Sequence, residues 1–308
     1  MTIEKYQGII PAFYACYDEN GNVSPKAVEK YTKWLVSKGV KGIYVGGSSG
    51  ECIYQSVAER KLILEHAVKA SAGRLTVIAH VACNNTKDSM ELAAHAESLG
   101  VDAIAAIPPI YFKLPEHSIA KYWNDISSAA PNTDFIIYNI PQLAGVALTL
   151  PLLREMLKNP RVIGVKNSSM PTVDIQQFKY EGMLGDRDFV VFNGPDEQLV
   201  SGLAIGADGG IGGTYSVMPE LYVKLFELFS MGDIKAAREL QYALNNIIYK
   251  LCEGKANLYA TIKATLKKRE GIDLGGVRAP LTNVSCEDIP IVEEASAMID
   301  AAIEKYVK

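Results

Sequence analysis

The chain has 308 residues, of which 48% are hydrophobic and 21% charged, and its formal net charge at pH 7 is -4. This length suits one large domain with a small extension, and the composition is typical of a soluble globular protein. The slight acidic excess argues against a nucleic-acid-binding surface, which needs basic residues concentrated on one face.

Cysteine usage and the N-terminus limit the cellular context. The five cysteines are scattered and form no C-x-x-C pair, which argues against a disulfide framework or a zinc knuckle. Residues 1–7 are polar and lack the apolar run of a signal peptide, and no later run is long enough to span a bilayer. We therefore expect a cytoplasmic protein that contacts neither nucleic acid nor membrane.

Short apolar runs alternate with longer amphipathic runs as far as residue 231. The predicted strands are residues 8–16, 42–45, 75–79, 103–107, 135–138, 162–165, 189–192 and 209–211. The predicted helices that follow them are residues 25–38, 56–72, 86–99, 116–130, 150–158, 172–183, 197–205 and 220–231. Ser24 before Pro25, and Ser56 three residues before Glu59, are typical signals of a helix start.

This alternation predicts the fold. The strands are apolar throughout, as strands are when both faces of a parallel sheet are buried. Eight strand–helix units favour a closed (β/α)₈ barrel, the TIM barrel of the α/β class, over an open doubly wound sheet. Helices at 234–252, 257–269 and 287–307 then follow with no strand between them. We expect residues 1–232 to form a catalytic barrel and residues 233–308 a helical extension packed on it.

Lys166 is the most informative candidate residue. It follows the apolar strand 162–165, and active sites of such barrels lie at the C-terminal ends of the strands. Burial disfavours a charged ammonium, so a lysine in this place can present a neutral amine that attacks a ketone and forms an imine. The alternative is a lysine that reaches solvent or pairs with an acid.

Other strand ends carry groups that suit the same chemistry. Tyr138 ends the preceding strand and can pass protons beside Lys166, although a tyrosine that only caps the barrel is equally common. The loop 46–50, Gly-Gly-Ser-Ser-Gly, offers N–H groups and hydroxyls to a carboxylate or phosphate, or is a simple turn. Asp196 and Glu197 can accept hydrogen bonds from hydroxyl groups, or simply begin a helix.

Metal and hydrolase sites are poorly supported by the sequence. The four histidines show no H-E-x-x-H or facial-triad spacing, and no G-x-S-x-G elbow is present. We therefore expect no metal and no cofactor other than a covalent imine with the substrate.

Four segments together resemble the pyruvate-dependent class I aldolase family that contains dihydrodipicolinate synthases and N-acetylneuraminate lyases. They are Gly-Gly-Ser-Ser-Gly-Glu at 46–51, Tyr-Asn-Ile-Pro at 138–141, Gly-Val-Lys at 164–166 and Gly-Ala-Asp-Gly-Gly-Ile-Gly at 206–212. The resemblance implies that Lys166 forms a Schiff base with pyruvate and that Tyr138 shuttles the proton. It also implies that Ser48 and Ser49 bind the pyruvate carboxylate.

The resemblance extends to further residues and to a branch of the family. Tyr111 matches a tyrosine that members lend across a subunit interface, and members are typically homotetramers. Leu143 stands where the synthases carry an arginine for a second carboxylate, and leucine cannot replace that ion pair. This favours the lyase branch, in which a sugar acid is cleaved reversibly to pyruvate. The remaining residues that the resemblance places around the sugar acid are Ser168, Gly194, Asp196, Glu197, Gly212, Gly213 and Tyr259.

Some residues depart from the lyase pattern and leave alternatives open. Gly213 stands where the lyases carry a serine, and 110–113 reads Ile-Tyr-Phe-Lys instead of Phe-Tyr-Tyr-Pro. The alternatives are another pyruvate-dependent sugar-acid aldolase or dehydratase, and the synthase itself. A third alternative, a keto-acid sensor without turnover, is disfavoured because Lys166 and Tyr138 are both present.

Overall fold

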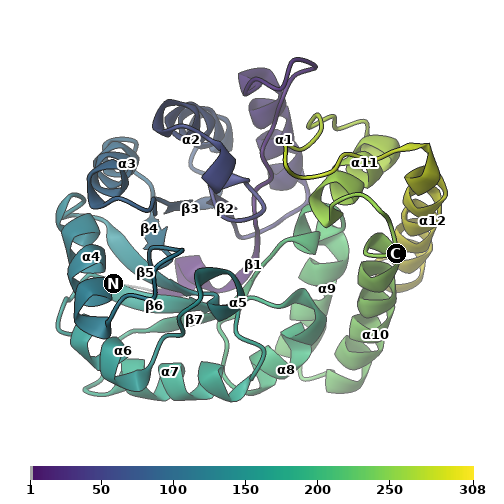
Figure 1. Cartoon of the computed structure of the whole chain (residues 1–308). Coiled ribbons are helices and arrows are strands. Elements are labelled where there is room, and N and C mark those ends of the chain that lie inside the picture. The colour runs from purple at the N-terminus through teal and green to yellow at the C-terminus, as the bar shows by residue number, and fades with distance from the viewer. Residues whose placement is uncertain (1–2) are drawn as a thin grey trace.

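The computed structural model describes residues 3–308 and contains an eight-stranded parallel barrel surrounded by helices (Figure 1). The strands are β1 (Gly8–Pro11), β2 (Gly42–Val45), β3 (Thr76–His80), β4 (Ala103–Ala106), β5 (Asp134–Asn139), β6 (Val162–Asn167), β7 (Val190–Asn193) and β8 (Gly209–Gly212). Neighbours follow the order β1-β8-β7-β6-β5-β4-β3-β2. A parallel bridge between Ala12 and Tyr44 brings the β1 and β2 ends together and closes the barrel.

The helices alternate with these strands and then continue without them. The helices of the barrel are α1 (Pro25–Ser37), α2 (Val57–Ser71), α3 (Thr86–Ser98), α4 (Glu116–Ser128), α5 (Pro141–Ala144), α6 (Leu150–Met156), α7 (Val173–Met183), α8 (Leu199–Ala204) and α9 (Pro219–Ser230). The C-terminal helices are α10 (Ile234–Leu251), α11 (Leu258–Glu270) and α12 (Ile289–Tyr306). Short 3-10 turns are η1 (Ile3–Tyr6), η2 (Cys52–Tyr54), η3 (Asp196–Gln198), η4 (Thr214–Ser216) and η5 (Cys286–Asp288).

The predicted (β/α)₈ barrel is confirmed, with a few local differences. The first strand ends at Pro11 rather than at residue 16, and the short helix α5 was not predicted. The predicted capping box forms: the Glu59 N–H donates to Ser56 Oγ at 3.2 Å, and the Ser56 N–H donates to Glu59 Oε2 at 2.8 Å. These bonds satisfy N–H groups that a helix start otherwise leaves free.

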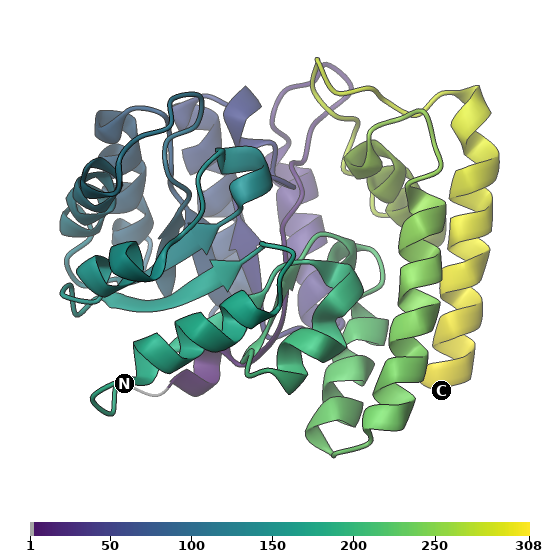
Figure 2. The same ribbon diagram turned by 60° about the horizontal axis from the view of Figure 1, so that its bottom comes forward.

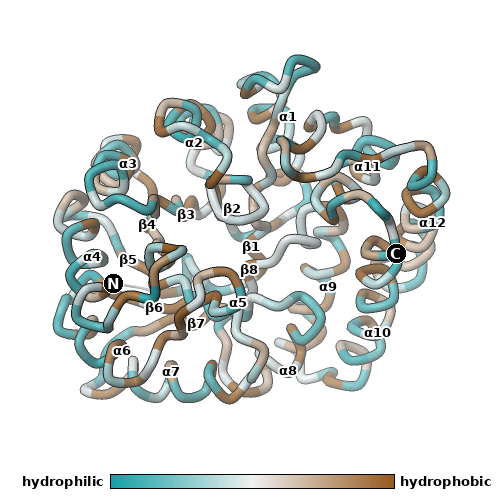
Figure 3. Tube along the Cα trace, in the orientation of Figure 1, coloured by the Kyte–Doolittle hydropathy of each residue, from teal (hydrophilic) through white to brown (hydrophobic). Residues whose placement is uncertain are grey.

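Two apolar layers hold the barrel. The inner layer fills the barrel and consists of Tyr6, Ile10, Tyr44, Ile78, Ala103, Ala105, Ile136, Tyr138, Ile163, Val190, Phe192 and Ile211. The outer layer joins the opposite faces of the strands to the surrounding helices, and Figure 3 shows hydrophobic and hydrophilic stretches alternating along those helices. Because the interior is packed with side chains, ligands reach it only at an end.

The C-terminal helices lie along one side of the barrel. Helix α10 packs against α9 and α12, and α11 packs against α12; Figure 2 shows α10 and α12 side by side. A division into a catalytic barrel (1–232) and an extension (233–308) remains a prediction, and residues 1 and 2 of the polar N-terminal stretch lie outside the described part. Within residues 3–308, no helix is both long and apolar enough to cross a membrane.

Candidate active site

Strands β5 and β6 bring the two central candidates together. Their register places Tyr138 directly opposite Lys166. The register shifts between Phe135 and Ile136, so that β6 carries one more residue than β5 at that point. Such a bulge re-aims the side chains that follow it. Tyr138 belongs to the inner layer of the barrel whereas Val165 belongs to the outer one, so the neighbouring Lys166 lies on the inner side.

Lys166 is buried between two aromatic rings. Lys166 is only 4% exposed to solvent. Its Nζ lies 4.0 Å from the centroid of the Tyr138 ring and 4.2 Å from that of the Tyr44 ring. No hydrogen bond or ion pair reaches Nζ from the residues that the structure describes, and the two aromatic faces contact it instead. The two aromatic faces favour a positive charge on this nitrogen.

An aromatic floor lies beneath this amine. The Tyr44 and Tyr138 rings meet edge to face, with centroids 5.7 Å apart. The centroid of the His80 ring lies 5.9 Å from that of the Tyr138 ring. Burial, and next the charge of Arg60, lower the pKa of His80 to about 3, so that its ring is neutral. His80 Nδ1 lies 2.8 Å from the Gly46 carbonyl and therefore carries the proton that it donates there. The neutral ring thus links the floor to the loop 46–51.

The loop 46–51 turns tightly between β2 and η2. Gly46 has a φ of 77° and Glu51 a φ of 53°, both in the left-handed region. The Glu51 N–H donates to the Ser48 carbonyl at 2.9 Å, which closes the turn. Ser48 is half-buried, Ser49 is buried, and a side chain at Gly213 would begin 3.3 Å from Ser49 Oγ. Ser49 therefore lies where the end of β8 meets the loop.

Asp196 begins η3, just past the end of β7, and contacts β8. Its Oδ2 accepts hydrogen bonds from the Thr214 N–H at 2.7 Å and from Thr214 Oγ1 at 2.5 Å. A Cβ at Gly212 would lie 1.9 Å from Asp196 Oδ1, so only glycine fits there. Burial raises the pKa of the Asp196 carboxyl to about 7, against the opposing effect of the Thr214 hydrogen bonds. This carboxyl can therefore exchange a proton near neutral pH.

A buried amide pair joins the ends of β5, β6 and β7. The Asn139 side-chain amide donates to Asn167 Oδ1 at 2.7 Å, and the Gly194 N–H donates to the Asn167 carbonyl at 2.8 Å. A Cβ at Gly194 would lie 2.1 Å from Ser168 Oγ, so these two predicted residues are in contact. The pair holds Ser168 and Gly194 at the barrel mouth beside Lys166.

Three predicted residues lie farther out. Tyr111 is 90% exposed, has a φ of 87° and contacts Phe112. Leu143 lies on α5 and is 59% exposed. The Glu197 side chain is exposed, and its backbone carbonyl accepts a hydrogen bond from the Asn245 side chain at 3.0 Å. These residues rim the mouth of the barrel, and the structure brings none of them into contact with Lys166.

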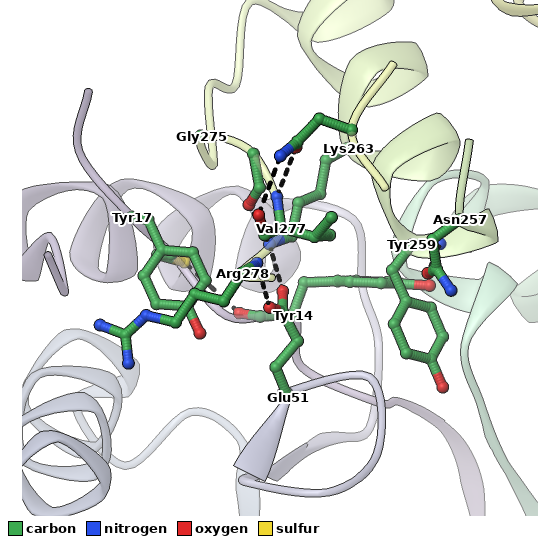
Figure 4. A network of polar contacts seen from close by, with 12 residues as sticks. Tyr14, Tyr17, Glu51, Asn257, Tyr259, Lys263, Gly275, Val277 and Arg278 are labelled. Atoms are coloured by element: carbon green, nitrogen blue, oxygen red, sulfur yellow. Dashed lines mark hydrogen bonds and ion pairs between the residues drawn. The ribbon is translucent and has the colours of Figure 1, made fainter. Parts of the chain in front are cut away.

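Tyr259 enters the site from α11. Its ring meets the Tyr14 ring edge to face, with centroids 5.7 Å apart (Figure 4). Burial and the neighbouring Tyr138 raise the pKa of the Tyr259 hydroxyl well above its usual value, and the nearby Ser49 hydroxyl opposes this rise. The C-terminal helices therefore contribute directly to the wall of the site.

Sequence reasoning missed Tyr44, His80 and Asn167 as parts of the site. Tyr44 lies in an apolar strand two residues before the glycine loop, and His80 ends β3. Their positions at strand ends were the available signal, but the face that each side chain takes depends on the strand register. Among residues 3–308, no group of three or more His, Cys, Asp or Glu side chains is arranged to hold a metal ion.

Comparisons with known proteins agree with this geometry. Residues 5–298 match the dihydrodipicolinate synthetase family. An N-acetylneuraminate lyase of Mediterraneibacter gnavus is 64% identical over 306 residues, which cover 99% of this chain and 96% of the relative. An N-acetylneuraminate lyase 2 of Escherichia coli is 35% identical over 94% of this chain and 93% of its own. The solved structure of a catalytic lysine mutant of Ruminococcus gnavus sialic acid aldolase has a TM-score of 0.97 and 64% identity, covering 99% of both chains.

Proposed function

The chain belongs to the dihydrodipicolinate synthetase family, and from this premise we propose that it is an N-acetylneuraminate lyase. It cleaves N-acetylneuraminate reversibly to N-acetylmannosamine and pyruvate through an imine on Lys166. The observation that carries the proposal is the buried Lys166 amine opposite Tyr138 at the barrel mouth. The 64% identity to a lyase over nearly the whole chain supports the choice of substrate.

The chemistry follows from the free amine and the phenol beside it. The Lys166 amine adds to the C2 ketone of the open-chain sugar acid, and loss of water leaves a protonated imine. The Tyr138 phenol gives up its proton to the departing hydroxide in that step, and the resulting phenolate then takes the proton of the C4 hydroxyl as the C3–C4 bond breaks and the bonding electrons move to the imine nitrogen. N-acetylmannosamine leaves, the resulting enamine takes a proton at C3, and water releases pyruvate and the free amine. The reaction needs no metal and no cofactor.

Two groups of residues would hold the substrate. Ser48, Ser49 and the N–H groups of their loop accommodate the carboxylate, because they offer donors at a tight turn. The sugar chain extends from this loop across the ends of β6, β7 and β8. We assign to it Ser168, Gly194, Asp196, Glu197, Gly212 and Gly213, with Tyr259 as part of the wall.

Leu143 argues against the synthase of the same family. The synthases carry an arginine at this position, which binds the carboxylate of their second substrate. Leu143 offers only an exposed apolar side chain. Another pyruvate-dependent sugar-acid aldolase or dehydratase remains the second candidate, because Gly213 removes a hydroxyl group from the sugar side. The Gly213 backbone lies close to Ser49, so there is little free space at this point of the site.

Assembly and location are part of the proposal. The exposed Tyr111 and Phe112 form an aromatic pair at the rim, as expected for side chains that a neighbouring copy covers. We propose a cytoplasmic homotetramer in which Tyr111 lies near a subunit interface and close to the site of the neighbouring copy.

Pyruvate release tests the proposal directly. The purified chain is incubated with N-acetylneuraminate, and the pyruvate and N-acetylmannosamine that form are quantified. The two products should appear in equal amounts. Pyruvate with aspartate semialdehyde serves as the parallel synthase assay and should give no product. Folded protein that releases no pyruvate from N-acetylneuraminate, or that condenses pyruvate with aspartate semialdehyde, would exclude the assignment.

A further inference from the structure

A buried ion pair joins the carboxylate-binding loop to the C-terminal helices. Lys263 Nζ lies 2.7 Å from Glu51 Oε1, although the two residues are 212 positions apart. The side chains are 1% and 0% exposed. Figure 4 shows Lys263 descending from α11 toward Glu51. Removing two charges from water is unfavourable unless each finds several partners, so a pair at this depth calls for an explanation.

The other partners of this pair are two backbone groups and an aromatic ring. Lys263 Nζ also donates to the Gly276 carbonyl at 2.7 Å and lies 4.9 Å from the centroid of the Tyr17 ring. The second oxygen of Glu51 accepts the Arg278 N–H at 2.9 Å. The pair therefore clamps three segments together: the loop 46–51, helix α11 and the segment 275–278.

The position of Glu51 connects this clamp to the substrate. Glu51 ends the turn that carries Ser48 and Ser49, and its own backbone is left-handed. A non-glycine residue keeps this conformation only when its surroundings hold it. Two charged hydrogen bonds on the Glu51 carboxylate provide that hold. They thereby set the position of the two serine hydroxyls, which lie two and three residues away.

The position of Lys263 connects the clamp to the wall of the site. Lys263 follows Tyr259 by four residues on α11, so the two side chains share one face of the helix. Tyr259 packs against Tyr14 and lies near Ser49. One helix face thus fixes the loop through Lys263 and covers it through Tyr259.

We propose that the Lys263–Glu51 pair is a positioning contact that holds the pyruvate-carboxylate loop in its binding geometry. This inference rests on the proposed function and adds two residues, neither of which touches the substrate. It assigns the C-terminal helices a part in substrate recognition and not only in stability.

The test measures pyruvate binding apart from folding. Full-length protein is titrated with pyruvate in the presence of cyanoborohydride, and the reduced adduct is counted by intact mass. The variants are Glu51→Gln, Lys263→Met and the double variant, which removes both charges and so leaves no buried ion without a partner. Lys267→Met is the matched control, since Lys267 lies one turn farther along α11 and pairs with Asp273 at the exposed surface.

We expect the half-saturating pyruvate concentration to rise about tenfold or more in the three test variants, because a misplacement of about 1 Å in a binding group has effects of this order. Adduct formation at saturating pyruvate should remain complete, and Lys267→Met should stay within about twofold of the unsubstituted chain. Thermal melting shows which variants are folded. If a single-substitution variant does not fold, the pyruvate half-saturation of the double variant tests the inference.

Folded variants with an unchanged half-saturating concentration would show that the pair only stabilises the fold and would overturn the inference. An unsubstituted chain that forms no adduct at all would instead overturn the proposed function. The two failures are therefore distinguishable in one experiment.

Discussion

The two sides of the barrel mouth are built in different ways. On one side, Tyr138 and Lys166 lie on adjacent parallel strands, and the strand register places them opposite each other. On the other side, Ser48 and Ser49 sit in a turn between the left-handed residues Gly46 and Glu51, and Glu51 pairs with Lys263, which is 212 residues away. The placement of Tyr138 and Lys166 therefore follows from the barrel topology, whereas the loop 46–51 is tied to a helix outside the barrel. Substitutions should separate the two sides.

The largest effect is expected for the amine itself. Lys166→Ala removes the nucleophile, and cleavage of N-acetylneuraminate should fall by about 10⁴-fold or more, as for other enzymes that lose a covalent nucleophile. Folding should be retained because no hydrogen bond to Lys166 is lost among the described residues. Steady-state pyruvate release checks this, and residual activity above one hundredth of the unsubstituted value would contradict it.

Tyr138→Phe should lower kcat by about 10²–10⁴-fold, the usual contribution of a general acid or base. The ring stays in the inner layer, so the melting temperature and the pyruvate half-saturation should change little. Measured kcat and KM for N-acetylneuraminate check the split. A loss expressed in KM alone would show that Tyr138 binds the substrate and does not transfer its proton.

Asp196 tests the sugar side through pH. Burial raises the pKa of Asp196 in the folded chain to about 7, whereas an exposed aspartate titrates near 4. The folded chain therefore favours the protonated form of Asp196. The stability that this gives is fully present below pH 4 and is lost as the pH rises through 7, and the loss is on the order of 4 kcal/mol at most. The free energy of unfolding should fall less steeply between pH 4 and 7 in Asp196→Asn than in the unsubstituted chain; equal slopes would contradict the assigned pKa.

The same substitution should affect substrate binding. A carboxylate accepts hydrogen bonds more strongly than an amide, so Asp196→Asn should raise the KM for N-acetylneuraminate about tenfold. The half-saturating pyruvate concentration should not change, because the Asp196 carboxylate bonds to Thr214 and not to Ser48 or Ser49. A parallel rise in both constants would mean that the two sides are not separable.

The smallest effect is expected at Tyr44. Tyr44→Leu removes one of the two rings that face the Lys166 Nζ, and kcat/KM should fall by roughly three- to thirtyfold, which corresponds to a cation–π contact of about 0.7–2 kcal/mol. Tyr44→Phe keeps the ring, and the Tyr44 hydroxyl has no partner among the described residues, so its kcat/KM should stay within about twofold. Equal losses in both variants would assign the effect to the hydroxyl.

The contrast between the two sides also explains what the sequence could predict. The alternation of apolar and amphipathic runs was sufficient for the barrel, and four motifs were sufficient for the family, which is confirmed over residues 5–298. Lys166 and Tyr138 were found because each ends a strand. The residue assignments themselves stay predictions.

The parts that escaped prediction depend on register and on distant contacts. No pattern in 42–45 indicates that Tyr44 faces Lys166, because a register shift between β5 and β6 decides which side chains meet. Glu51 stands in the sequence as the last residue of the motif at 46–51, where nothing indicates that its side chain is buried. Its partner, Lys263, lies in an amphipathic helix where a buried lysine has no local signature.

Formation of a reducible imine on Lys166 is the central claim. The chain is incubated with pyruvate and borohydride, the intact mass is measured, and the modified peptide is sequenced. We predict a single stable pyruvate adduct on Lys166 in the unsubstituted chain and none in Lys166→Ala. An adduct that persists in that variant, or that maps to another lysine, would contradict the account.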